Sequence, residues 1–248
     1  MDRVLLETVA SSLVVDGVPP VVRASLGRIS DHEEEEGLLP DNFFEAVVPQ
    51  EHFVNVYNYM ARCKEWTSSN KRWVRDVRYV STIGSVLSSE YSSPHSSQTS
   101  VSCTTTKTVR SCLLETDSLD APNIRIVTET TLDAPLPSNN DSYIEMERIK
   151  KKSFSFNARS LPGTTWTFEF VISWKGTCPN DLKSVVPVYR MNLVMTRACA
   201  NGDSWEKPTM ESALPLAHTF LEKVRDIVDI TRRCKLSIYE SKSLFDSA

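Results

Sequence analysis

Residues 143–176 contain the pattern that most constrains how this chain can fold. The stretch, YIEMERIKKKSFSFNARSLPGTTWTFEFVISWKG, divides at Pro162 and Gly163, two residues that favour a turn. Side chains of a strand alternate between its two faces, so one face of the second half is strongly apolar: Trp166, Phe168, Phe170, Ile172 and Trp174. The opposite face is mostly polar: Thr167, Glu169, Val171 and Ser173. The pattern predicts an antiparallel hairpin with one buried face.

The first half of this hairpin is basic at one end and aromatic at the other. Five residues share one of its faces: Arg148, Lys150, Lys152, Phe154 and Phe156. We expect the hairpin to bury one face in a core and to present its cations, with Glu169, to a channel.

Composition limits the class of protein. A chain of 248 residues that is 40% hydrophobic can build one domain over residues 1–248. The formal net charge of −4 argues against a protein that coats nucleic acid generally, so anion affinity has to come from local clusters of basic residues. Scattered single cysteines favour a reducing compartment. We expect a soluble intracellular protein of the nucleus or cytoplasm, with the nucleus favoured.

Alternating and helical patterns predict the remaining elements. We expect strands at residues 21–29, 72–80, 107–115, 123–131 and 188–196, and helices at residues 4–15, 51–63 and 210–234. The fold class that results is a β-dominated α+β fold, a closed antiparallel tunnel-like β-barrel of about eight strands with flanking helices. The Ser/Thr-rich residues 81–106 are predicted to be a mobile loop or a hairpin tip. A β-sandwich remains an alternative, and it would expose to water the basic residues that a tunnel gathers around one axis.

Four motifs, in order along residues 21–196, resemble a known family. VVRASLGRI is similar to E-x-E-A-R-L-G-x-I, NIRIVTETTLDAP to an arginine strand that ends in Glu and Pro, RIKKKSFSF to R-x-K-x-R-x-S-[YF], and WTFEFV to W-x-I-D-L-T. The set resembles the fungal and protozoal mRNA-capping RNA 5′-triphosphatases, which are triphosphate-tunnel barrels. The resemblance implies a tunnel that holds an RNA triphosphate among Arg and Lys, with divalent metal bound by two E-x-E strands.

The resemblance supplies candidate site residues. The anion-binding candidates are Arg23, Lys107, Arg110, Arg125, Arg148, Lys150, Lys152 and Arg190. Glu129 and Glu169 are the catalytic candidates if the chain is active. The same alignment puts Val21 and Arg23, and on the last strand Arg190 and Asn192, where the family has its E-x-E glutamates.

Both metal-binding E-x-E pairs are therefore predicted to be missing. A hard divalent cation needs several carboxylate oxygens, so no metal and no cofactor are expected, or Mg²⁺ or Mn²⁺ if the chain is an enzyme. Glu145 and Glu147 form a separate E-x-E, which we expect to be a solvated rim at the mouth of a strand.

Two functions from different classes follow. The first is a catalytically degenerate pseudoenzyme, a binding or scaffold subunit in mRNA capping, mRNA processing or transcription, with protein partners and no membrane. Its basic tunnel either holds an RNA 5′ end or another anion, or is plugged because its charges pair internally. The alternative is an active metal-dependent RNA 5′-triphosphatase, a polynucleotide 5′-phosphatase.

Overall fold

The structure is a computed structural model that describes residues 3–29, 44–63, 68–69, 74–81, 86–91, 100–115, 122–135, 143–157, 163–176, 185–197 and 207–233. Its helices are α1 (Arg3–Leu13), α2 (Gln50–Arg62) and α3 (Met210–Arg233). Its strands are β1 (Val21–Ile29), β2 (Phe44–Glu45), β3 (Ser68–Ser69), β4 (Val74–Ser81), β5 (Val86–Tyr91), β6 (Ser100–Leu114), β7 (Asn123–Asp133), β8 (Tyr143–Asn157), β9 (Thr164–Gly176) and β10 (Val188–Arg197).

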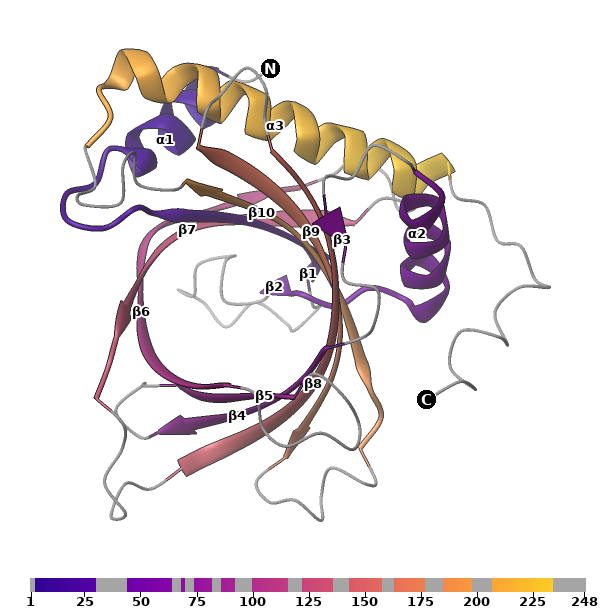
Figure 1. The fold of residues 1–248 in the computed structure, drawn as a ribbon. Helices are drawn as coiled ribbons and strands as arrows, with labels where there is room; N and C mark the ends of the chain where they lie inside the picture. Colours follow the sequence, from indigo (N-terminus) through magenta and orange to yellow (C-terminus); the bar gives the residue numbers. More distant parts are fainter. Residues whose placement is uncertain are drawn as a thin grey trace, which may run out of the picture.

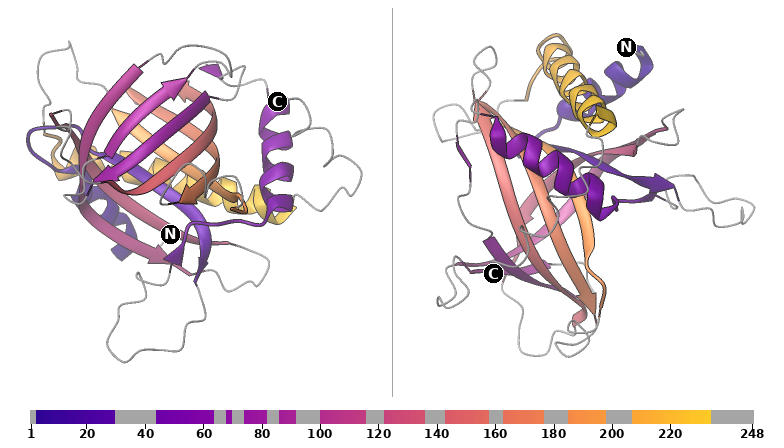
Figure 2. Two further views of the ribbon diagram at one scale, coloured as in Figure 1. Left: turned by 90° about the horizontal axis from the view of Figure 1, so that it is seen from below. Right: turned by 90° about the vertical axis from the view of Figure 1, so that its right-hand side faces the viewer.

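The strands form one antiparallel sheet that curls strongly about an axis (Figure 1, Figure 2). Neighbours follow the order β10-β9-β8-β4-β5-β6-β7-β1-β2, with β3 paired to β8. The two ends of the curl meet where Val22–Ser25 of β1 pair with Asn192–Met195 of β10.

The sheet is a curled, incompletely closed barrel, which corrects the prediction of a closed one. Beyond the short seam with β10, Arg28 and Ile29 of β1 pair with β2 instead. The edge of β10 is met there by the segment after β2, where the Val48 amide donates to the carbonyl of Tyr189 at 2.9 Å. The β-dominated antiparallel architecture with flanking helices is confirmed.

The helices pack on the outer, convex face of the sheet (Figure 1). Alternation on β1 sends Val22, Ala24 and Leu26 into this layer, where each is at most 2% exposed. On β9, Trp166 stacks on Phe220 of α3, with ring centroids 6.1 Å apart. The apolar face predicted for the hairpin is thus the outer face, and the core lies between sheet and helices rather than inside the curl.

Residues 81–106, predicted as a mobile loop or a hairpin tip, are strand in part. Residues 86–91 form β5 and pair with β6, which begins at Ser100, so much of this stretch is strand. Thr and Ser suit a strand when cross-strand partners are available, and here Val86 pairs with Thr104. Residues 82–85 and 92–99 lie outside the described residues, as does Cys234 at the end of the predicted 210–234 helix.

Among the described helices, none is long and apolar enough to cross a membrane.

A candidate charge network on the inner face of the barrel

The inner, concave face of the sheet carries the candidate site. The register of β1 with β7 and β10 places Arg23 opposite Val127 and Val194, and Ser25 opposite Arg125 and Asn192. Outward-facing Val22 and Ala24 flank Arg23 in sequence and anchor it, because they are buried against the helices. Arg23 is therefore held on the inner face by the alternation of β1 itself.

Arg23 lies between the two carboxylates that the sequence singled out. Its Nη1 donates to Glu169 Oε2 at 2.9 Å, and its Nε lies 3.9 Å from Glu129 Oε2. The Glu169 side chain is 15% exposed and that of Glu129 25%, so both carboxylates are largely withdrawn from water. Glu129 and Glu169 come from strands on opposite sides of β1, and a single guanidinium joins them.

Two further cations on this face also have carboxylate partners. Lys151 Nζ lies 3.8 Å from the other oxygen of Glu169. Arg190 Nη2 donates to Glu147 Oε1, and the Glu147 side chain is only 9% exposed. Buried charges require partners of this kind, so the pairs hold β8, β9 and β10 together across the inner face.

Arg125 has a different environment. Its Nε donates to the hydroxyl of Ser111 at 3.1 Å on the neighbouring strand β6. The structure gives this guanidinium no carboxylate partner among the described residues. Its neighbour in register, Ser25, donates to Asn192 Oδ1 at 2.9 Å, so this part of the inner face is polar without being acidic.

The remaining predicted cations lie on the outer face. The register of β8 with β9 pairs Lys150 with Ile172 and Lys152 with Phe170, on the apolar side of the hairpin. Lys152 Nζ donates to the Tyr57 hydroxyl of α2 at 2.8 Å and lies over its ring. Arg148, opposite Trp174, is exposed.

The two β6 candidates lie on the outer face as well. Arg110 Nη1 donates to Ser11 of α1 at 3.2 Å, and Lys107 is exposed opposite Thr130. The eight anion-binding candidates therefore do not converge: Arg23, Arg125 and Arg190 share the inner face, and the rest do not. Whether any of them binds an anion stays a prediction.

Sequence reasoning missed Lys151, although the signal was present, and it placed Glu147 wrongly. Phe154 aligns with Phe168 in the register and is 4% exposed, so it belongs to the buried outer face. Residues an even number of positions before it share that face, which assigns Lys152 outward and Lys151 inward. Glu147 was expected at a solvated rim, but its ion pair with Arg190 draws it into the inner face.

The described residues contain no group of three or more His, Cys, Asp or Glu side chains that could hold a metal ion. Glu145 belongs to β8, but its side chain lies outside the described part. Each described carboxylate of the inner face, from Glu129 to Glu169, lies beside an Arg or Lys. Chemically, the side chains that the structure describes on this face form a set of nearly balanced ion pairs with one additional cation, Arg125.

No protein-family model and no curated protein sequence matches this chain. Solved structures do. The S. pombe Pct1 RNA triphosphatase aligns with a TM-score of 0.64 at 12% identity, over 91% of each chain. The same enzyme in complex with the Spt5 CTD gives 0.60 at 13% identity, over 94% of this chain and 93% of that one. The Mimivirus capping enzyme triphosphatase gives 0.52 at 9% identity, over 92% and 99%. At these identities the likeness shows the fold alone, a fold shared with RNA triphosphatases of mRNA capping.

Proposed function

We propose that this chain is a non-hydrolysing relative of the RNA triphosphatases, acting as a binding or scaffold subunit in mRNA capping or transcription. The fold it shares with Pct1 and the Mimivirus enzyme supports the capping context. One observation carries the proposed loss of catalysis: the Arg23 guanidinium lies between Glu129 and Glu169, paired with Glu169 at 2.9 Å and 3.9 Å from Glu129. It supplies the positive charge that a metal ion would otherwise bring to them.

The carboxylates that the structure describes on the inner face do not fit a divalent metal ion. Such an ion needs several carboxylate oxygens without a competing cation. Here Arg23 lies 2.9 Å from Glu169, and Lys151 approaches the same carboxylate at 3.8 Å. At an effective dielectric of ~20, two unit charges ~4 Å apart repel by about 4 kcal/mol, and a doubly charged ion feels about twice that. The motif alignment, which puts Val21, Arg190 and Asn192 at the other ligand positions, agrees with this.

Phosphate release tests the loss of catalysis. Purified chain is incubated with triphosphate-ended RNA and with ATP, in Mg²⁺ or Mn²⁺. We expect no release above that of buffer. Metal-dependent release that disappears in both Glu129→Ala and Glu169→Ala would show that the alternative, an active RNA 5′-triphosphatase, is right. Arg28→Ala is the matched control, because its ion pair with Glu45 lies on exposed side chains outside the network.

The partners proposed for such a scaffold are proteins of the transcription and capping machinery in the nucleus. Pct1, which shares the fold, has been solved in complex with the Spt5 CTD, so a peptide of that segment is a concrete candidate. Fluorescence anisotropy with a labelled Spt5 CTD peptide and its scrambled sequence measures the interaction. Equal binding of the two peptides would remove this candidate.

A second candidate function is anion capture, and Arg125 is the observation that favours it. Among the described residues its guanidinium has a hydroxyl partner in place of a carboxylate, so donors remain for a phosphate or carboxylate ligand. We expect Arg125→Gln to weaken salt-sensitive binding of triphosphate-ended RNA, and Lys152→Gln, a cation of the outer face, to leave it unchanged. Equal losses in both variants would mean that binding is a general surface effect.

A further inference from the structure

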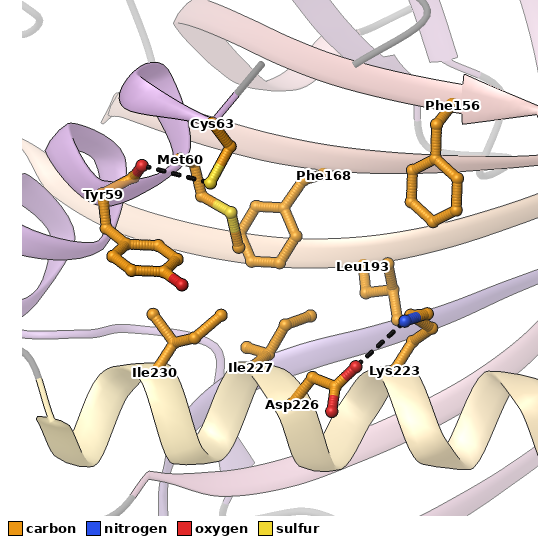
Figure 3. A pocket seen from close by; sticks show the side chains of 10 residues that line it. All are labelled: Tyr59, Met60, Cys63, Phe156, Phe168, Leu193, Lys223, Asp226, Ile227 and Ile230. Carbon is orange, nitrogen blue, oxygen red and sulfur yellow. Dashed lines mark hydrogen bonds and ion pairs between the residues drawn. The ribbon is translucent and has the colours of Figure 1, made fainter. Parts of the chain in front are cut away.

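An apolar pocket opens between the two long helices and the outer face of the sheet, away from the charge network (Figure 3). Its volume is about 260 Å³. The lining residues come from α2 and the residue that follows it, from α3 and from strands β8 to β10: Tyr59, Met60, Cys63, Phe156, Phe168, Leu193, Lys223, Asp226, Ile227 and Ile230. Figure 3 shows side chains of α2 and α3 gathered with Phe156 and Phe168 of the hairpin around the pocket.

The lining favours an aromatic occupant. Two phenylalanine rings, Phe156 and Phe168, offer faces and edges for ring packing, and the Met60 thioether adapts its shape to an aromatic neighbour. Tyr59 at the entrance is 50% exposed, a large apolar surface left uncovered beside the cavity. Water gains little in such a cavity because few polar groups line it.

The rim favours an uncharged occupant. Lys223 Nζ and Asp226 Oδ2 already form an ion pair of 3.0 Å there, seen beside the cavity in Figure 3. An acidic or a basic ligand would have to compete with one member of this pair, whereas a neutral ring leaves it intact. The rim is balanced in charge, so complementarity selects against formal charge on the ligand.

Size distinguishes a peptide anchor from a cofactor. Pockets for drug-sized ligands and cofactors commonly span roughly 300–1,000 Å³, and this one is smaller. Protein interfaces, in contrast, often centre on one aromatic side chain inserted into an apolar pocket. We propose that this pocket binds a single uncharged aromatic side chain, Trp or Phe, presented by a peptide segment of a partner protein. The inference does not depend on the proposed function of the inner face.

The test uses the full chain and short capped peptides, acetyl-Gly-Gly-Xaa-Gly-Gly-amide, in which Xaa is Trp, Phe, Leu, Glu or Lys. Saturation-transfer NMR measures affinity, and the alkylation rate of Cys63, a free thiol in the pocket, reports where the peptide binds. We expect the Trp and Phe peptides to bind at least tenfold more tightly than the Glu and Lys peptides, and to slow Cys63 alkylation.

Variants separate the pocket from the rest of the surface. Ile230→Trp fills the cavity and should weaken the Trp peptide at least tenfold, whereas Ile230→Val should not. Tyr59→Ala, a change at an exposed position, provides a second variant that does not disturb the core and should weaken binding severalfold. Leu132→Trp adds an aromatic at a position that is 53% exposed on β7, outside the pocket, and should leave affinity unchanged.

Three results overturn the proposal. The first is that the charged peptides bind as tightly as the aromatic ones. The second is that binding of the Trp peptide survives both Ile230→Trp and Tyr59→Ala. The third is that the free chain binds no peptide and its Cys63 is already protected from alkylation, which would mean that this chain or a second copy of it fills the pocket.

Discussion

Removal of the Arg23 side chain tests the charge network most directly. In Arg23→Ala, Glu129 and Glu169 lose the guanidinium between them, and Lys151 at 3.8 Å from Glu169 is the nearest remaining cation that the structure places there. Both carboxylates stay largely buried by the strands that carry them. We therefore expect the folded state to lose stability, because two like charges then face each other with partial solvation.

The magnitude follows from burial. Ion pairs between exposed side chains contribute about 0–1 kcal/mol, and breaking a fully buried pair costs about 3–5 kcal/mol. The Arg23–Glu169 pair is intermediate, with side chains 34% and 15% exposed. We expect Arg23→Ala to lower the free energy of unfolding by about 2 kcal/mol, between these two limits. The same strand supplies a control: Arg28–Glu45 has the same 2.9 Å separation but side chains that are 70% and 42% exposed. Arg28→Ala should cost less than about 0.5 kcal/mol.

Urea denaturation measures both variants at low and high salt. A double-mutant cycle with Glu169→Gln isolates the pair, and we expect a coupling free energy of about 1 kcal/mol between Arg23 and Glu169. High salt should reduce the cost of Arg28→Ala more than that of Arg23→Ala, because the Arg23–Glu169 pair is less accessible to ions than the Arg28–Glu45 pair. A cost for Arg23→Ala no larger than that for Arg28→Ala, with zero coupling to Glu169, would refute the reasoning.

Three further outcomes are expected. Gly27→Ala should destabilise the fold by about 2 kcal/mol in urea, because a Cβ there would lie 2.0 Å from the Glu45 carbonyl oxygen and force β1 and β2 apart; an unchanged midpoint would contradict this contact. Burial raises the pKa of the Tyr189 hydroxyl above its ordinary 10.0. The folded state therefore favours the protonated form, and this stability is complete below pH 10 and is lost as the pH rises through the raised pKa. Tyr189→Phe should reduce the alkaline loss in a pH series of denaturation curves, and equal slopes would be against it. Trp166→Ala removes a fully buried ring stacked on Phe220 and should cost about 4 kcal/mol, a large fraction of the roughly 5–15 kcal/mol that stabilises a domain, which urea denaturation would measure.

The sequence predicted the elements better than it predicted their closure. Residues 21–29 and 188 onward were expected as strands, and they are β1 and β10, since alternation of apolar and polar residues is a local property. The seam between β1 and β10 could not be predicted in the same way. It depends on how far β1 continues beside β10 before Arg28 pairs with β2, a long-range competition that no pattern within one strand encodes.

The candidate site was also predicted only in part. Arg23, Glu129 and Glu169 were identified through the family resemblance, and the structure brings them together. Lys150 and Lys152 were expected to line the channel, but the two phenylalanines of β8 determine the orientation of that strand, since burying their rings is favourable whereas burying ammonium groups is costly. A shift of one residue exchanges Lys152 for Lys151. In a basic run such as IKKKS the charges alone do not reveal which lysine faces inward, and only the apolar neighbours do.

If Arg23 acts as the resident cation of the inner face, replacing its charge should expose a dependence on added cations. Arg23→Glu brings a third carboxylate beside Glu129 and Glu169, so the variant should be destabilised in a chelator. Mn²⁺ binds the folded state through these oxygens, and at a concentration of ~100 times its dissociation constant it returns about 2.7 kcal/mol of stability. The wild-type melting temperature should not change with Mn²⁺, and that of Arg28→Glu, a matched reversal on the same strand, should not either. A variant that stays destabilised at every Mn²⁺ concentration would mean that the three positions are not spaced for a shared ion, and that Arg23 bridges its carboxylates without replacing a metal.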